Sequence, residues 1–218
     1  MNPMRADVVL ADGDIVLRLP RRRDARAWGD VRVRNASWLR PWDATLPAPD
    51  PSVPTTFAAM VRYNHREARA GRMWSFSVFY SGRLVGQVTL GGVSYGSLRS
   101  GYVGYWIDEG VAGMGIIPTG VALVSDFAFS SLRLHRLEIN VRPENAPSSR
   151  VAEKLGFRLE GARAAYLHID GDWRDHVTYV LFGGDLPDGV LATFLGSATP
   201  SERPPVPEKG DGSDDTGG

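Results

Sequence analysis

One strand–helix–strand segment, set among hairpins, constrains the fold more than any other feature of the chain. Residues 100–108 (SGYVGYWID) and 135–141 (HRLEINV) are strand-like, and apolar residues at helical spacing predict a helix over 118–131 between them. A helix between two strands is the crossover connection that joins parallel strands of one sheet. The sheet must therefore include these two strands in a parallel arrangement.

The other predicted strands are joined mainly by tight turns. Strands are expected at 14–20, 74–80, 83–93, 157–169 and 173–182, with SG at 81–82 and DGD at 170–172 as hairpin turns. Helices are expected from Asp24 to about Ala36, from Thr55 or Thr56 to about Ala70, and over 146–156, where Gly156 suits a helix end. The order of elements, βααβββαβαββ, predicts a mixed, α+β-like α/β fold and excludes a doubly wound sheet.

The composition indicates a soluble globular protein and excludes sites that depend on cysteine. The chain has 218 residues, 43% of them hydrophobic and 23% charged, which is typical of one soluble domain. The chain has no cysteine, which excludes disulfides, thiolate zinc sites and a cysteine nucleophile. There is no run of 18 apolar residues and no apolar segment near the N-terminus. Neither a membrane span nor a signal peptide is therefore expected, and the expected location is cytoplasmic.

The chain is expected to form one domain followed by a tail. Residues 1–196 make the folded domain, and residues 197–218 are rich in Pro, Gly, Ser and acids, which predicts disorder. The net charge is zero, so direct binding of nucleic acid is not expected. Arginine outnumbers acid in residues 1–40, which gives either a solvated face or a basic patch for an acidic or RNA-rich partner. We expect a monomer or a homodimer.

The segment EGVAGMGIIP, residues 109–118, connects the predicted strand to the predicted helix. Gly113 and Gly115 stand where backbone N–H groups and the positive end of the helix dipole point outward, and Pro118 suits a first helical turn. The residues alone allow a plain turn or a loop that binds phosphate. A dinucleotide-binding loop is excluded, because the segment follows the fourth predicted strand and lacks a third glycine.

Two motifs together resemble those of one enzyme family. GVAGMG (110–115) fits the glycines of a coenzyme loop Q/R-x-x-G-x-G/A, and NAPS followed by EKLGF (145–157) fits a second motif. Both are typical of the GNAT family of acetyl-CoA-dependent N-acetyltransferases, although Gly110 replaces the usual Gln or Arg. NASWLRPW (35–42), VGYW (103–106) and YLHIDGDWRDHV (166–177) resemble its RimJ-like, ribosomal-protein-alanine N-acetyltransferase branch. The resemblance covers roughly residues 12–184.

The resemblance implies a fold and a coenzyme site. The GNAT fold has a central, mostly antiparallel sheet of about seven strands, flanked by helices, in which the fourth and fifth strands splay apart. Acetyl-CoA is the implied cosubstrate, without metal: its pantetheine arm lies in the cleft and its pyrophosphate rests on the N–H groups of residues 111–116. The residues implied for coenzyme binding are Trp106, Ile107, Val111, Ala112, Gly113, Met114, Gly115, Ile116 and Asn145.

Acyl transfer to an amine needs an oxyanion donor, a path for the amine proton and help for the leaving thiolate. Backbone N–H groups within 106–108 are candidates for the first. The resemblance places Ser148 at the thiolate, with a helix cap as the alternative role and Ser149 as its rival. Relatives carry a Tyr or an acid where this chain has Ala152 and Ala165, so those groups are missing.

Glu138 is the candidate base, acting through water, because Glu138 and Asn140 share one face of a strand that borders the cleft. The alternative for Glu138 is an ion pair with Arg136 or another arginine. The four histidines have no metal-ligand spacing and are expected to be surface or hairpin residues.

The implied acceptor is the N-terminal α-amine of a protein, a ribosomal protein in this branch. Expected substrate-binding residues are Trp38, Trp42, Tyr105 and Asn140. Roughly a tenth of an α-amine is neutral at pH 7, against about 0.04% of a lysine side chain, so a weak base suits the α-amine. The alternatives are a small amine such as an antibiotic or polyamine, and a degenerate protein that binds acetyl-CoA as a sensor.

Overall fold

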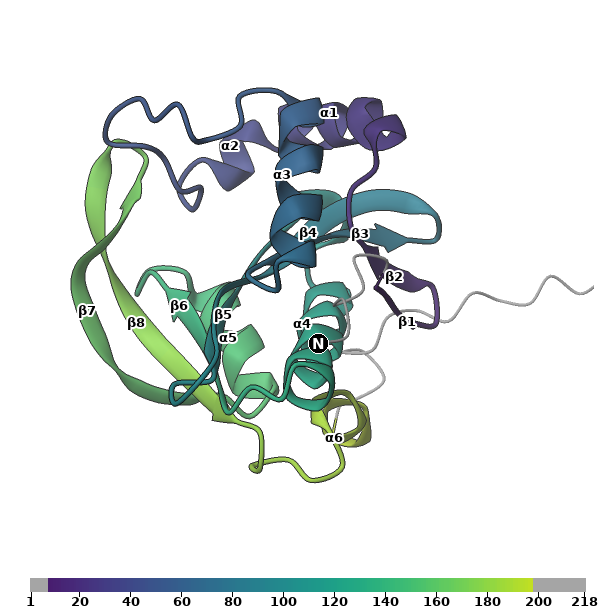
Figure 1. The fold of residues 1–218 in the computed structure, drawn as a ribbon, viewed down its shortest axis with the longest axis vertical. Helices are drawn as coiled ribbons and strands as arrows, with labels where there is room; N and C mark the ends of the chain where they lie inside the picture. Colours follow the sequence, from purple (N-terminus) through teal and green to yellow (C-terminus); the bar gives the residue numbers. More distant parts are fainter. Residues whose placement is uncertain (1–7, 198–218) are drawn as a thin grey trace, which may run out of the picture.

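The structure is a computed structural model that describes residues 8–197. These residues form an eight-stranded sheet in the order β1-β2-β3-β4-β5-β6-β8-β7, flanked by helices (Figure 1). The strands are β1 (Val9–Asp12), β2 (Ile15–Arg18), β3 (Trp74–Tyr80), β4 (Arg83–Ser94), β5 (Ser100–Ile107), β6 (Arg136–Val141), β7 (Arg158–Ile169) and β8 (Asp172–Phe182). The helices are α1 (Ala25–Arg34), α2 (Ala36–Leu39), α3 (Phe57–Arg69), α4 (Ile116–Asp126), α5 (Ala146–Lys154) and α6 (Val190–Ser197).

The predicted fold class is confirmed, with one strand more than the expected seven or so. The additional strand is β1, which turns back at Gly13 and pairs antiparallel with β2 along the edge of the sheet. The predicted fourth and fifth strands are therefore β5 and β6. Helix α6 was not predicted, and the tail expected at 197–218 lies outside the described residues apart from Ser197, the last residue of α6. None of the helices in 8–197 combines the length and apolar character needed to cross a membrane.

Strands β5 and β6 are joined through α4 and are parallel, but they are paired over a short stretch. Their register runs only from Ser100 opposite Arg136 to Tyr102 opposite Glu138. Beyond that point β5 continues to Ile107 beside β4, and β6 continues to Val141 beside β8. The two strands therefore part, as predicted, and a gap opens between their carboxyl ends.

The core lies on both faces of the central strands. In β3, residues 74–78 are all buried, which requires cover on both faces of the sheet because side chains alternate. Trp74 and Phe76 contact the ring of Phe127, just after α4, edge-on. The buried Ser75 and Ser77 point to the other face, and α3 contacts β3 there. The sheet is thus fixed between two helical layers, which makes it a rigid support for the loops at its edge.

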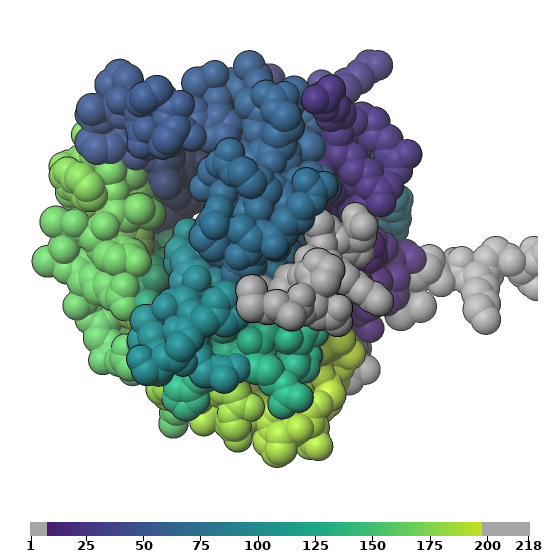
Figure 2. All heavy atoms as spheres, in the orientation of Figure 1, coloured from purple at the N-terminus to yellow at the C-terminus, as the bar shows by residue number. Residues whose placement is uncertain are grey.

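The connection 40–56 is held against the β7–β8 hairpin. In the predicted DGD turn, Asp172 belongs to β8, and Asp170 and Gly171 form a two-residue turn in which both have positive φ. Ala44 forms a bridge with Ile169, and the N–H of Thr45 donates to the carbonyl of His168 at 2.9 Å. In the space-filling view this connection lies directly against the hairpin tip (Figure 2). The hairpin therefore fixes the segment that carries Trp42.

Helix α5 ends as the sequence predicts. Gly156 has φ +79°, and the N–H groups of Gly156 and Phe157 donate to the carbonyls of Glu153 and Ala152 at 3.0 Å. This double hydrogen bond satisfies the last carbonyls of the helix and needs a left-handed residue.

Gly156→Ala is expected to lower the free energy of unfolding by about 1–2 kcal/mol, the cost of a left-handed non-glycine residue. A Cβ at Gly156 would meet only Leu186 side-chain atoms, at 3.6 Å or more, so the cost comes from conformation rather than collision. Gly29→Ala, within α1 and with no neighbour within 4 Å, should instead gain about 0.5–1 kcal/mol. Urea denaturation measures both, and equal changes in the two variants would contradict the prediction.

Candidate active site

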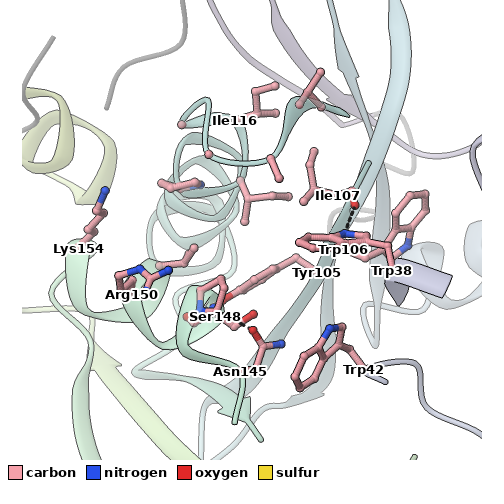
Figure 3. Close-up of a pocket in the computed structure, with 18 of the residues that line it drawn as sticks. Trp38, Trp42, Tyr105, Trp106, Ile107, Ile116, Asn145, Ser148, Arg150 and Lys154 are labelled. Atoms are coloured by element: carbon pink, nitrogen blue, oxygen red, sulfur yellow. Dashed lines mark hydrogen bonds between the residues drawn. The ribbon is translucent and has the colours of Figure 1, made fainter. Parts of the chain in front are cut away.

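A cavity of about 510 Å³ opens where β5 and β6 part. Trp38 and Trp42 border it on one side, the loop 111–115 and the start of α4 at one end, and α5 on the far side (Figure 3). The predicted coenzyme residues line this cavity, with the exception of Met114, whose side chain is packed against the core. The chain thus brings together segments that are separated by about 110 positions in sequence.

The register of β5 decides which peptide groups face the gap. Trp106 pairs with Gln87, and the N–H of Asp108 donates to the carbonyl of Val85 at 2.7 Å. Peptide groups on one strand point alternately to its two neighbours. Those of Trp106 and Asp108 therefore point to β4, and those of Tyr105 and Ile107 point into the gap. The backbone contact expected at both Trp106 and Ile107 is thus available at Ile107 and at Tyr105 rather than at Trp106.

One of these peptide groups has a partner from the tryptophan loop. The indole Nε1 of Trp38 donates to the carbonyl of Ile107 at 3.1 Å (Figure 3). This bond crosses the mouth of the gap and holds α2 against the end of β5. Trp38 therefore lines this cavity beside the end of β5.

The glycine loop has the conformation that glycine alone adopts without strain. Gly113 has φ +82° and Gly115, which precedes the first residue of α4, has φ +75°. A Cβ at Gly113 would meet nothing within 4 Å, so this residue is glycine for its conformation and leaves space for an incoming group. The N–H groups of Ile116 and Ile117 start the helix and have no partner within it. This end of the cavity is suited to an anion.

Two cations missed in the sequence also line the cavity. Arg150 and Lys154 are four residues apart on α5 and project from one face of the helix (Figure 3). Within residues 8–197, none of the residues that line the cavity is an acid. The four-residue spacing of Arg150 and Lys154 on the helix that follows NAPS could have indicated that both side chains lie on one face. A cavity bordered by two cations, helix N–H groups and apolar walls fits a ligand with phosphates and an uncharged arm.

Ser148 lies where this cavity meets a second one of about 180 Å³. Trp42, Tyr105, Asn145 and Ser148 line both cavities. Asn145 Oδ1 accepts from the N–H of Ser148 at 3.1 Å, so Asn145 and not Ser148 caps α5. The hydroxyl of Tyr105 donates to the carbonyl of Ser148 at 3.0 Å. The Ser148 backbone is therefore fixed from two sides, and its hydroxyl is not needed for capping.

The second cavity is bordered by residues of β5, β6, β7 and β8 and by Trp42. Asn140 lines it and accepts from the hydroxyl of Thr178 at 2.7 Å. Arg142 donates to the carbonyl of Pro41 at 2.7 Å, and its guanidinium lies 5.4 Å from the centroid of the Trp42 ring. Trp42 is thus held over the junction of the two cavities. Of the four residues predicted to bind substrate, Trp42, Tyr105 and Asn140 line this second cavity and Trp38 does not.

Glu138 does not line either cavity. Its Oε1 accepts from Arg136 at 3.0 Å and its Oε2 accepts from Arg163 at 2.7 Å. Arg136 also binds Glu160. Both carboxylate oxygens of Glu138 are therefore engaged by arginines, which favours the ion-pair alternative over the role of base.

His176 lines the second cavity and was not singled out in the sequence. It lies in the last hairpin, as predicted, and is 3% exposed. It lies on β8 two positions before Thr178, so both side chains are on the same face as Asn140. Strand alternation could have indicated this placement once the pairing of β6 and β8 was known.

A buried network fixes the end of β5 against α1 and α2. Asp108 accepts from Arg34 Nε at 3.1 Å and from Asn35 Nδ2 at 2.9 Å, and the N–H of Glu109 donates to Asn35 Oδ1 at 2.9 Å. Burial alone raises the pKa of Asp108. The hydrogen bonds from Arg34, Asn35 and a backbone N–H outweigh burial and hold the pKa below its ordinary value of 3.8. This network positions the start of the glycine loop.

A search of family profiles matches residues 14–158 to the acetyltransferase (GNAT) domain. The chain belongs to this family. The GNAT resemblance drawn from the two motifs is thereby confirmed, and the chain is an acetyltransferase with homologues named N-acetyltransferases.

Relatives place the chain near the ribosomal-protein branch of GNAT enzymes. It is 39% identical over 114 residues to the probable N-acetyltransferase YjcK of Bacillus subtilis. This match covers 51% of the present chain and 63% of YjcK, which is less than two thirds of the length of YjcK. The chain is 30% identical to the Escherichia coli ribosomal protein uS5-alanine N-acetyltransferase, over 84% of this chain and 94% of that protein. Mycobacterium smegmatis RimJ in complex with CoA-disulfide is 34% identical, with a TM-score of 0.80 over 90% of this chain and 97% of that one.

Asp108→Asn is expected to lower the free energy of unfolding at pH 7 by about 1–3 kcal/mol, because Arg34 and the buried Asn35 both lose their charged acceptor. A folded-state pKa below that of the unfolded chain gives stability that is present above pH 3.8 and lost as the pH falls through the folded-state value. The difference between variant and wild type should therefore shrink in acid.

Urea denaturation at pH 7 and at pH 3 measures this difference. Asp30→Asn removes a carboxylate that is 66% exposed in a 3.8 Å surface pair and serves as the control, with a change within about 0.5 kcal/mol. A constant difference at both pH values would contradict the role given to the Asp108 charge.

Proposed function

We propose that the protein transfers the acetyl group of acetyl-CoA to the N-terminal α-amine of a protein, and that the acceptor is a ribosomal protein. The observation that supports this most directly is the meeting of two cavities at Ser148 and Tyr105. One cavity suits a phosphate-bearing coenzyme, and the other approaches the same point from the opposite side of the parted strands. A thioester at the junction would be reachable from both.

The coenzyme would lie along β5. Its pantetheine amides would pair with peptide groups of Tyr105 and Ile107, which β6 does not cover. Its pyrophosphate would rest on the N–H groups of residues 111–116, with the cations of Arg150 and Lys154 close by. Asn145 caps α5 through the N–H of Ser148, and we propose that it also contacts the pantetheine.

The chemistry would centre on Ser148. An amine attacks the thioester carbon, the C–S bond breaks and negative charge develops on sulfur. A hydroxyl at the junction can donate to that sulfur. A backbone N–H of β5 that faces the gap at the junction, that of Tyr105, can donate to the carbonyl oxygen as it becomes an oxyanion.

The acceptor cavity favours an α-amine of a peptide over a polyamine. Its walls include Trp42, Val103, Ile139, Leu167 and Ile169, and its lining includes no acid and one permanent cation, Arg142. A polycationic amine would meet repulsion there and no counter-charge. The presence of this cavity beside the coenzyme cavity also favours catalysis over a sensor that only binds acetyl-CoA.

The names of the relatives agree with this choice of acceptor. The E. coli relative is named for alanine of ribosomal protein uS5, and the M. smegmatis neighbour contains a CoA derivative. A ribosomal-protein acceptor is consistent with the cytoplasmic location expected from the sequence.

The test is acetylation of short peptides that begin with Ala, Ser, Met or Leu, and of a peptide with a blocked N-terminus and one lysine. We expect transfer to the Ala and Ser peptides to exceed that to Met and Leu, because Trp42 closes the small cavity over the first side chain. Mass spectrometry gives the site and the rate. Faster acetylation of the blocked lysine peptide, or of spermidine, would contradict the proposal.

Ser148→Ala is expected to lower the rate of acetyl transfer by about 10- to 1,000-fold, because the hydroxyl acts on charge that exists only in the transition state. The dissociation constant of acetyl-CoA, measured by calorimetry, should change little. Ser149→Ala is the matched control, since Ser149 lines neither cavity. If Ser149→Ala transferred acetyl slowly and Ser148→Ala kept full activity, the contact with the thiolate would be assigned to Ser149.

A further inference from the structure

The acceptor cavity has one side chain that can accept a proton at neutral pH. Of the residues that line it, Arg142 is a permanent cation, and burial raises the pKa of Tyr105, so its phenol stays protonated. Asn140 and Ser148 are not basic. His176 remains, on β8, in the same cavity as Ser148.

One hydrogen bond and one aromatic contact orient the ring of His176. Its Nδ1 lies 3.0 Å from the carbonyl oxygen of Arg174. A carbonyl only accepts, so Nδ1 carries the proton and donates, and the lone pair of the neutral ring is on Nε2. Tyr166 meets the ring edge-on, with the centroids 5.4 Å apart, and limits its rotation. The ring is therefore held in one tautomer, with an unprotonated nitrogen left for another partner.

We propose that His176 is the catalytic residue that takes the proton of the acceptor amine, with Nε2 as the accepting atom. This inference rests on the proposed function. As the amine nitrogen bonds to the acetyl carbon, His176 Nε2 takes one N–H proton. The C–S bond then breaks and its electron pair goes to sulfur. The thiolate takes up one proton and the imidazolium releases one to solvent, so the enzyme returns to its starting state.

The surroundings keep His176 neutral at pH 7. Burial is the largest influence and lowers the pKa of His176 below its ordinary value of 6.5, although the hydrogen bond to the Arg174 carbonyl raises it. The charged and titratable groups near the ring from neighbouring elements are Arg142 and Glu144 after β6, Asp175 on β8, and Arg163 and Tyr166 on β7. An imidazole that is neutral at pH 7 is in the form that can accept a proton from the acceptor amine.

The test compares wild type, His176→Gln and His135→Gln by the pH dependence of kcat/KM for the best peptide, at saturating acetyl-CoA. His135 is an exposed histidine outside both cavities and should behave as wild type. In wild type, log kcat/KM should fall with slope one below the pKa of the free amine and with slope two below that of His176. His176→Gln should lose the second slope and about 10²- to 10⁴-fold in rate at pH 7.

Acetyl-CoA affinity and thermal unfolding of each variant show whether the coenzyme site and fold are intact. Imidazole added to His176→Ala should restore part of the rate, which a purely structural role would not produce. A folded His176→Gln within threefold of wild type would overturn the proposal. If the variants do not fold, wild type decides alone: the second slope should begin at the His176 pKa measured by NMR titration of its ring, and a single slope that continues below that measured pKa would also overturn the proposal. Failure of wild type to acetylate any peptide would instead overturn the proposed function.

Discussion

The parting of β5 and β6 after Tyr102 and Glu138 is the constraint on which the rest of the site depends. Each strand keeps a full partner on its other side, β4 for β5 and β8 for β6, so the sheet stays whole while one ladder stops. The peptide groups of Tyr105 and Ile107 are then left facing a gap. Buried peptide groups need partners. The Trp38 indole supplies one, and the proposed coenzyme would supply others.

Charged groups mark both ends of the opening. At the closed end, Glu138 stands opposite Tyr102 and binds Arg136 and Arg163, so its carboxylate ties β6 to β7 at the last paired position. At the open end, Asp108 binds Arg34 and Asn35 and ties β5 to α1 and α2. Glu138, first considered as a base, is thus better explained as a residue that holds β6 and β7 together.

Charge is distributed unevenly along the two cavities. Arg150, Lys154 and the start of α4 make the coenzyme end attractive to phosphates, and the acceptor end has Arg142 and the neutral His176. Neither lining contains an acid. These linings support the proposal of an anionic donor and of an acceptor that enters with little charge, such as an α-amine.

Local sequence determined the elements and the coenzyme loop, because their signals are contained within a few residues. Gly113, Gly115 and Gly156 have positive φ, the SG and DGD turns close their hairpins, and the strand–helix–strand segment fixes a parallel pair. Strand β1 was not predicted, because four residues at the edge of a sheet show little alternation of apolar and polar side chains. Only the tertiary structure decided which side chains meet. His176 and Ser148 are far apart in sequence, and they share a cavity because β8 pairs with β6 beside the start of α5. Glu138 and Asn140 are on one face of one strand, but only Asn140 lines the cavity. Glu138 binds Arg136 on its own strand and Arg163 on β7, and the second contact could not be read from the local pattern because β7 lies two strands away in the sheet.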